Sequence, residues 1–192
     1  MPSSITPTPT QLRALTHPAR LRMLGILRLD GPQTATALAT RLGLNTGATS
    51  YHLRQLAQHG FITDDESRGN GRERWWKAMH SSTHADLPEA PGPEDEEAMD
   101  AYLQTVVSTY ARQLQAAIEE RATLPKGWRD AGTFSDWQPR LTPGQTRQLV
   151  ERMTTIMEEL EAQEPEEGAE QVTVMLHAFP RPGAVGAGES QW

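Results

Sequence analysis

Apolar residues recur at helical spacing through the first third of the chain. Leu12 and Leu15 predict a short helix, and residues 18–29 place Leu21, Leu24 and Leu27 on one face of a second helix. Pro18 suits the first turn of that second helix, where a backbone amide has no partner within the helix. Residues 34–42 repeat the pattern and predict a third helix. Its inward positions are Ala35, Leu38, Ala39 and Leu42.

A three-residue connection, Gly43 to Asn45, follows the third helix and precedes a longer amphipathic helix. Asn45 or Thr46 can cap this fourth helix, which runs to His59 and ends at Gly60. A short helix, a glycine-containing turn and a longer helix are typical of a helix-turn-helix.

Two short strands are predicted after the fourth helix, at residues 61–63 and 73–78. The segment between them carries Asn70 and Gly71 at its tip, which indicates a hairpin. Helices followed by a hairpin predict a winged helix. Trp75 and Trp76 alternate across the second strand, so we expect one of them in the core.

The second half predicts a long helix at 94–121, of 28 residues and about 42 Å. Its apolar stripe is too long for one small neighbour to cover. A strand is expected at 133–137, a helix after the capping box at Thr142–Gln145, and a strand at 170–179. The predicted fold class is therefore mainly α with small β (α+β), with a C-terminal α+β module built on a long dimerisation helix.

Composition suggests where the domains divide. Residues 1–10 have the composition of a disordered lead, and 11–80 form the predicted winged helix-turn-helix domain. Proline, glycine and acids crowd residues 81–95, as in a linker. Residues 96–180 are predicted to form a dimerisation and possible effector domain, and 181–192 a flexible tail.

The net charge of −7 conceals an uneven distribution. Residues 1–85 hold ten Lys and Arg against five Asp and Glu, and residues 86–192 hold eight against twenty. An acidic chain can therefore still offer its first half to a polyanion. Arginine supplies 16 of the 18 basic residues, which suits phosphate and guanine contacts, although a GC-rich genome would give the same bias.

Several classes of protein are disfavoured. No apolar run approaches the roughly 18 residues of a membrane span, and no secretory signal or cysteine is present, so we expect a cytoplasmic protein without cysteine-based metal sites. His80 and His84, with Asp86, could in principle bind a metal, but they lie in the linker and lack a third rigid ligand. We therefore expect no metal and no cofactor. The motifs of hydrolases, phosphate-binding loops and metalloproteases are absent, and we expect no enzyme.

Three segments together resemble the arsenic-repressor-like (ArsR-type) winged helix-turn-helix regulators of bacteria. These are LRALTHPARLRMLGIL, TATALATRLGLNTGATSYHLRQLAQHGFI and GRERWWKA, within about 70 of the 192 residues. The resemblance implies a repressor that binds double-stranded DNA. Two features depart from the family: no metal-sensing ligand set can be placed, and residues 47–50 read Gly-Ala-Thr-Ser, so the base preference cannot be transferred.

Candidate DNA contacts follow from this fold. The N-terminal part of the fourth helix would enter the major groove, where Arg54 suits guanine and Gln55 suits adenine. The predicted contacts of this helix are Thr46, Gly47, Ser50, Tyr51, Arg54 and Gln55. His52 is expected to pack between helices or to contact a phosphate.

The wing adds Arg68 and Arg72 to the predicted DNA contacts. The resemblance to the ArsR-type family implies that a wing arginine is directed toward the minor groove, and Arg72 is the residue expected there. Asp64, Asp65 and Glu66 are expected to hold the stem of the wing away from the DNA.

The long helix is predicted to hold two copies of the chain together through Tyr102, Val106, Tyr110 and Leu114. A homodimeric, sequence-specific DNA-binding repressor is thus the leading hypothesis. Two alternatives stay open. One is a small-molecule sensor with an effector pocket beneath Met153, Met157, Met175 and the tryptophans Trp128 and Trp137. The other is a winged helix that binds protein instead of DNA.

Overall fold

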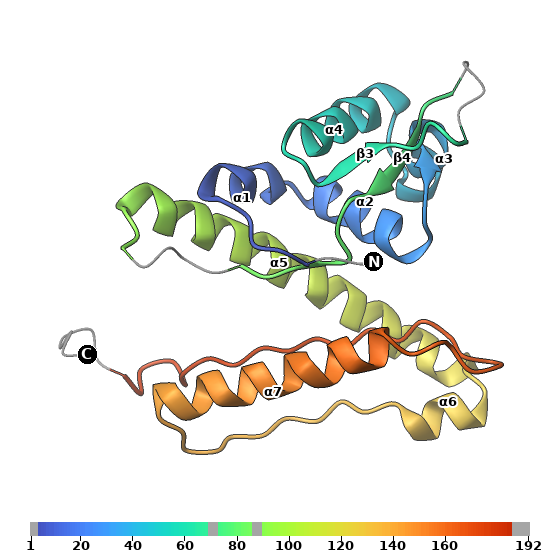
Figure 1. The fold of residues 1–192 in the computed structure, drawn as a ribbon. Coiled ribbons are helices and arrows are strands. Elements are labelled where there is room, and N and C mark those ends of the chain that lie inside the picture. Colours follow the sequence, from blue (N-terminus) through green and yellow to red (C-terminus); the bar gives the residue numbers. More distant parts are fainter. Residues whose placement is uncertain (1–3, 69–72, 86–89, 186–192) are drawn as a thin grey trace. The chain divides into compact units, whose positions relative to one another are not determined.

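A computed structural model describes residues 4–68, 73–85 and 90–185. The chain divides into two compact units, Met1–Ala131 and Gly132–Trp192 (Figure 1). Helices dominate and the sheets are small, which confirms the predicted α+β class.

Four helices build the first part of the first unit, and each begins at a residue whose side chain caps it. They are α1 (Pro9–Leu15), α2 (Pro18–Leu29), α3 (Ala35–Leu42) and α4 (Thr46–Gln58). The capping residues are Thr8, His17, Thr34 and Asn45. Since such caps satisfy amides that have no partner within the helix, the helix starts lie close to those that local sequence chemistry predicted.

A three-stranded antiparallel sheet forms the wing, in the order β2-β4-β3. The strands are β2 (Gln33–Thr34), β3 (Ile62–Asp64) and β4 (Trp75–Ala78). The predicted antiparallel pairing of the two hairpin strands is confirmed, and the predicted tip at Asn70 and Gly71 lies outside the described residues. Strand β2 was not predicted. Trp76 is buried and Trp75 is half-buried, as expected for neighbours on opposite faces of a strand.

The expectation of a disordered lead at residues 1–10 is wrong for its described part. Strand β1 (Ser4–Ile5) pairs in parallel with β5 (Ser82–Thr83), and Ile5 packs against the core. Thr8 forms a capping box with Gln11. Composition alone did not show that this proline-rich segment carries a cap and a pairing edge.

A half-buried arginine fixes the chain after the wing. Arg28 of α2 donates from Nε to the His80 carbonyl oxygen at 2.9 Å and from Nη2 to Thr83 Oγ1 at 2.8 Å. Burial lowers the pKa of Arg28. This arginine therefore has a structural role in holding β5 against α2.

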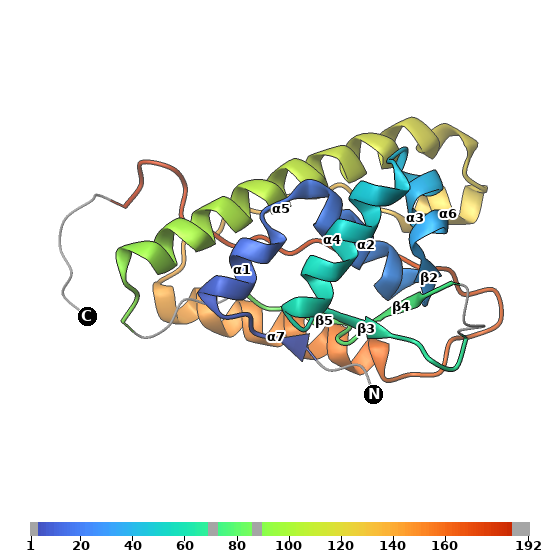
Figure 2. The same ribbon diagram turned by 90° about the horizontal axis from the view of Figure 1, so that it is seen from above.

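The long helix α5 (Pro93–Glu120) belongs to the core of the first unit through its N-terminal half. Ala98, Met99 and Tyr102 join the hydrophobic cluster formed by α1, α2 and α4, and α1 lies along α5 (Figure 2). Thr105 Oγ1 donates to the Thr16 carbonyl oxygen at 3.0 Å. Past Tyr110, every residue of α5 is exposed.

A short 3₁₀ turn (Arg121–Thr123) and α6 (Lys126–Ala131) complete the first unit. Across the described parts of the whole chain, no helix is long and apolar enough to cross a membrane.

The second unit contains α7 (Pro143–Glu161), which begins at the predicted capping box of Thr142 and Gln145. The strands expected at 133–137 and 170–179 are not formed. A strand needs a neighbouring strand to pair its backbone, and neither of these segments has one within residues 132–185. No residue in this range is buried.

Candidate nucleic-acid interface

The turn between α3 and α4 determines how α4 is presented. Gly43 adopts the left-handed conformation, with φ 65° and ψ 35°, which side chains other than glycine rarely tolerate. The Asn45 side chain then accepts a hydrogen bond from the Ala48 amide at 2.7 Å, so Asn45 is the cap. Leu53 and Leu56 anchor the inner face of α4 in the core.

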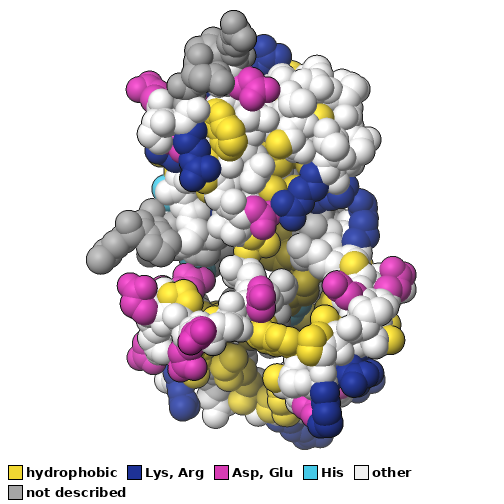
Figure 3. All heavy atoms as spheres, turned by 90° about the vertical axis from the view of Figure 1, so that its right-hand side faces the viewer, with side chains coloured by type: hydrophobic (Ala, Val, Ile, Leu, Met, Phe, Trp, Pro, Cys, Tyr) yellow, Lys and Arg dark blue, Asp and Glu magenta, His cyan; other side chains and the backbone are white. Residues whose placement is uncertain are grey.

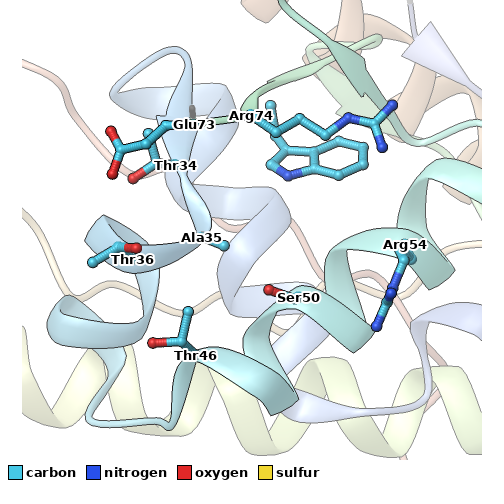
Figure 4. Close-up of a pocket in the computed structure, with 9 residues that line it drawn as sticks. Thr34, Ala35, Thr36, Thr46, Ser50, Arg54, Glu73 and Arg74 are labelled. Carbon is cyan, nitrogen blue, oxygen red and sulfur yellow. The ribbon is translucent and has the colours of Figure 1, made fainter. Parts of the chain in front are cut away.

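A cavity of about 400 Å³ lies between one side of α4, the start of α3 and the start of β4. Figure 4 shows Thr46, Ser50 and Arg54 along its α4 side, one helical turn apart from one another. The other lining residues are Thr34, Ala35, Thr36, Glu73, Arg74 and Trp76. Hydroxyl and guanidinium groups from three elements therefore border one hollow.

The six predicted contacts of α4 all lie away from its fully buried positions. Thr46, Gly47, Tyr51 and Arg54 are exposed, whereas Ser50 and Gln55 are half-buried. The structure brings Thr46, Ser50 and Arg54 to the cavity and leaves Tyr51 on the open side of the helix.

Ion pairs neutralise two of the three acids at the stem of the wing, Asp64 and Asp65. Asp65 contacts Arg68 at 3.7 Å and Lys77 at 3.3 Å, and Asp64 pairs with Arg74. A hydrogen bond from Ser67, together with Lys77, holds the pKa of Asp65 below its ordinary value. These pairs weaken the repulsion that the sequence predicted between the stem and DNA.

One of the two wing arginines among the predicted contacts, Arg68, lies within the described residues. Arg68 is exposed and its guanidinium lies 5.7 Å from the centre of the Trp75 ring. Arg72 lies outside the described residues, so its predicted minor-groove contact stays a prediction.

The predicted DNA contacts did not include Thr34, Thr36 or Arg74, although Arg74 is one of the basic residues of the wing, and all three line the cavity. Thr34 pairs with Trp75 across β2 and β4, and this pairing brings the start of α3 to the wing. The sequence shows that Thr34 can cap a helix, but it does not show the register of the sheet. Arg74 lies over the Trp76 ring at 4.5 Å.

The four predicted dimerisation residues have different surroundings within one chain. Tyr102 is buried in the chain's own core, and burial raises its pKa to about 12. Val106 packs against that core and Tyr110 is half-buried. Leu114 is 43% exposed. Leu114 is thus the most accessible of the four.

The histidines considered as metal ligands, His80 and His84, are half-buried, and Asp86 lies outside the described residues. Within residues 4–68, 73–85 and 90–185, no three His, Cys, Asp or Glu side chains are grouped as a metal ion would require.

Residues 15–65, from the end of α1 through β3, match the profile of a family described as "Helix-turn-helix domain". No curated protein matches the chain. Residues 15–65 of the first unit therefore form a helix-turn-helix domain, and this domain supports a role as a DNA-binding transcriptional regulator.

Solved structures similar to the chain include Lactococcus lactis ZitR, as its C30AH42A mutant in apo form. The identity is 12%, the match covers 76% of this chain and 83% of that one, and the TM-score is 0.34. Another is the adhesin competence repressor (AdcR) of Streptococcus pyogenes, at 16% identity, 76% and 81% coverage and a TM-score of 0.29.

Proposed function

We propose that the protein is a cytoplasmic, homodimeric repressor of the ArsR type that binds specific DNA sequences and catalyses no reaction. The observation that carries this proposal is the outer face of α4, where Arg54 is exposed beside a polar cavity. An arginine of this kind can donate two hydrogen bonds to guanine in the major groove. Its neighbours Tyr51 and Gln55 extend the same face.

The dimer is supported by a second apolar face on α5. Leu103, Val107, Leu114 and Ile118 are between 43% and 60% exposed. At 100° per residue they fall within one stripe about 60° wide, whose centre lies about 130° from the middle of the buried face of Met99, Tyr102 and Thr105. Hydrophobic side chains also reach the molecular surface in Figure 3. Such a stripe is typical of a helix that packs against a second copy.

A dimer would also increase the specificity of DNA binding. One winged helix reads a single short half-site, whereas two copies can read half-sites about 34–36 Å apart on one face of the duplex. The acidic second half of the chain would keep the dimer contacts away from the phosphates.

The deciding experiment is selection of duplexes from a random pool with the full-length protein, followed by sequencing. We expect enrichment of a palindromic or pseudo-palindromic site. Sedimentation of the protein with the selected duplex should give two chains per duplex. Recovery of no preferred sequence would contradict sequence-specific binding, and one chain per duplex would contradict the dimer.

A further inference from the structure

Three basic side chains meet where α2 begins beside α4. The rings of His17 and His52 lie 4.3 Å apart between their centres, and Arg20 is close enough for its charge to act on His52 and Tyr51. His17 Nδ1 accepts a hydrogen bond from the Ala19 amide at 3.1 Å, which fixes that ring at the start of α2.

Two polar atoms of this cluster are buried without a hydrogen-bond partner among the described residues. They are Arg20 Nε and His52 Nδ1. A buried polar group that lacks a partner costs free energy, so this arrangement suggests that something outside the chain completes the site. Burial lowers the pKa of both Arg20 and His52, as expected where positive charge lacks compensation.

No described carboxylate forms an ion pair with this cluster. From Met1 to Thr63 the sequence has one acidic residue, Asp30, and that carboxylate pairs with Arg41. By contrast with Arg41, Arg20 forms no ion pair with any described residue. The missing counter-charge must therefore come from a ligand or from solvent.

The position of His52 on α4 indicates which ligand could complete the cluster. Ser50 faces the cavity beside the wing and His52 faces α2, and two residues turn a helix by about 200°. The two positions thus mark opposite flanks, with the exposed Tyr51 between them. A helix about 10–12 Å wide fills a major groove about 12 Å wide, so each flank meets one phosphate backbone.

We propose that Arg20, supported by His17 and His52, binds a backbone phosphate of the DNA strand opposite the one that the wing side approaches. The inference rests on the proposed function and adds a second point of attachment, at Arg20 of α2, to the contacts on the wing side of α4. A phosphate there would supply the missing negative charge and hydrogen-bond acceptors. With contacts on both flanks, α4 would be held centrally in the groove.

The test compares the salt dependence of DNA binding for full-length variants on a duplex of random sequence, since phosphate contacts do not depend on sequence. Arg20→Gln keeps the length and hydrogen bonding of the side chain and removes its charge. We expect it to lower the slope of log K against log salt by about one unit for each bound subunit. Arg20→Lys should restore most of the slope.

Arg22→Gln is the matched control, because Arg22 is exposed on the same helix about 200° from Arg20. We expect it to keep the wild-type slope. Thermal melting shows whether each variant is folded.

Each outcome decides the matter. An unchanged slope in folded Arg20→Gln, or equal losses in Arg20→Gln and Arg22→Gln, would overturn the phosphate site and leave the proposed function intact. A wild-type protein without salt-dependent DNA binding would overturn both. If inorganic phosphate stabilises the DNA-free protein through Arg20 while the DNA slope is unchanged, the site binds free phosphate and the inference is wrong.

Discussion

The arginines of the first four helices differ in their partners more than in their sequence context. Arg13 contacts Glu94 at 3.5 Å, Arg41 pairs with Asp30, and Arg28 binds backbone carbonyls. Arg20 and Arg54 have no ion pair among the described residues. Some arginines of these helices therefore have structural roles, whereas others are available to contact phosphates and bases.

Replacing Arg54 by alanine tests direct reading of a base. On the selected duplex we expect a loss of about 1–3 kcal/mol in binding free energy, because one bidentate contact to a base edge disappears. On random duplexes the loss should be smaller. Fluorescence anisotropy titrations on both duplexes measure the difference, and equal losses would show that Arg54 contacts only the backbone.

The His52 ring gives the stability a dependence on pH. Burial, followed by the positive charges of His17 and Arg20, lowers the pKa of His52 below its ordinary 6.5. The unfolded chain therefore binds a proton more readily than the folded chain. We expect the free energy of unfolding to fall as the pH drops through about 6.5.

Chemical denaturation at pH 7.5 and pH 5.5 tests this expectation without DNA. His52→Gln should lose less stability between the two pH values than the wild type does. Asp65, whose pKa is lowered from 3.8, stays charged at both pH values and does not obscure the comparison. Identical pH dependence in variant and wild type would show that His52 does not contribute.

At the scale of elements, the sequence predicted what local chemistry determines. Pro18, the Gly43 turn, Gly60 and the Thr142 capping box each mark a boundary through contacts within a few residues. The pairing of β1 with β5 and of β2 with β4 joins segments more than 40 residues apart, and it was missed.

The same distinction explains the strands that were wrongly predicted in the second half. Residues 170–179 alternate apolar and polar side chains, yet alternation supplies no partner strand. For the candidate site, the α4 residues could be predicted from one helix. The cavity residue Thr36 and the Arg20 cluster required knowledge of which elements touch.

The N-terminal half of α5 acts as a core element of the DNA-binding unit. Met99 is buried against α1 and α2, so Met99→Ala should lower the free energy of unfolding by about 2–5 kcal/mol. Gln104→Ala, on an exposed position of the same helix, should change it by less than about 0.5 kcal/mol. Urea denaturation compares the two, and similar values would mean that α5 does not stabilise the unit.

At the scale of the whole molecule, α5 links DNA binding to the proposed dimer because it has two apolar faces. One face completes the core of the helix-turn-helix unit through Ala98, Met99 and Tyr102. The other is the exposed stripe that includes Val107 and Ile118. Changes on the second face can therefore alter assembly without removing a side chain from the core.

The paired substitution Val107→Glu and Ile118→Glu tests this division of roles. Two carboxylates on the stripe should prevent a second copy from packing there, since buried unpaired charges are costly. We expect a monomer at micromolar concentration in sedimentation velocity, and at least about tenfold weaker binding to the selected duplex, because only one half-site is read at a time. The matched control, Gln104→Glu with Gln113→Glu, adds the same charge at exposed polar positions of α5 and should remain dimeric with little loss of affinity. If the stripe variant stays dimeric, the second copy binds elsewhere; if it is monomeric yet binds DNA as tightly as the wild type, two copies are not needed for recognition.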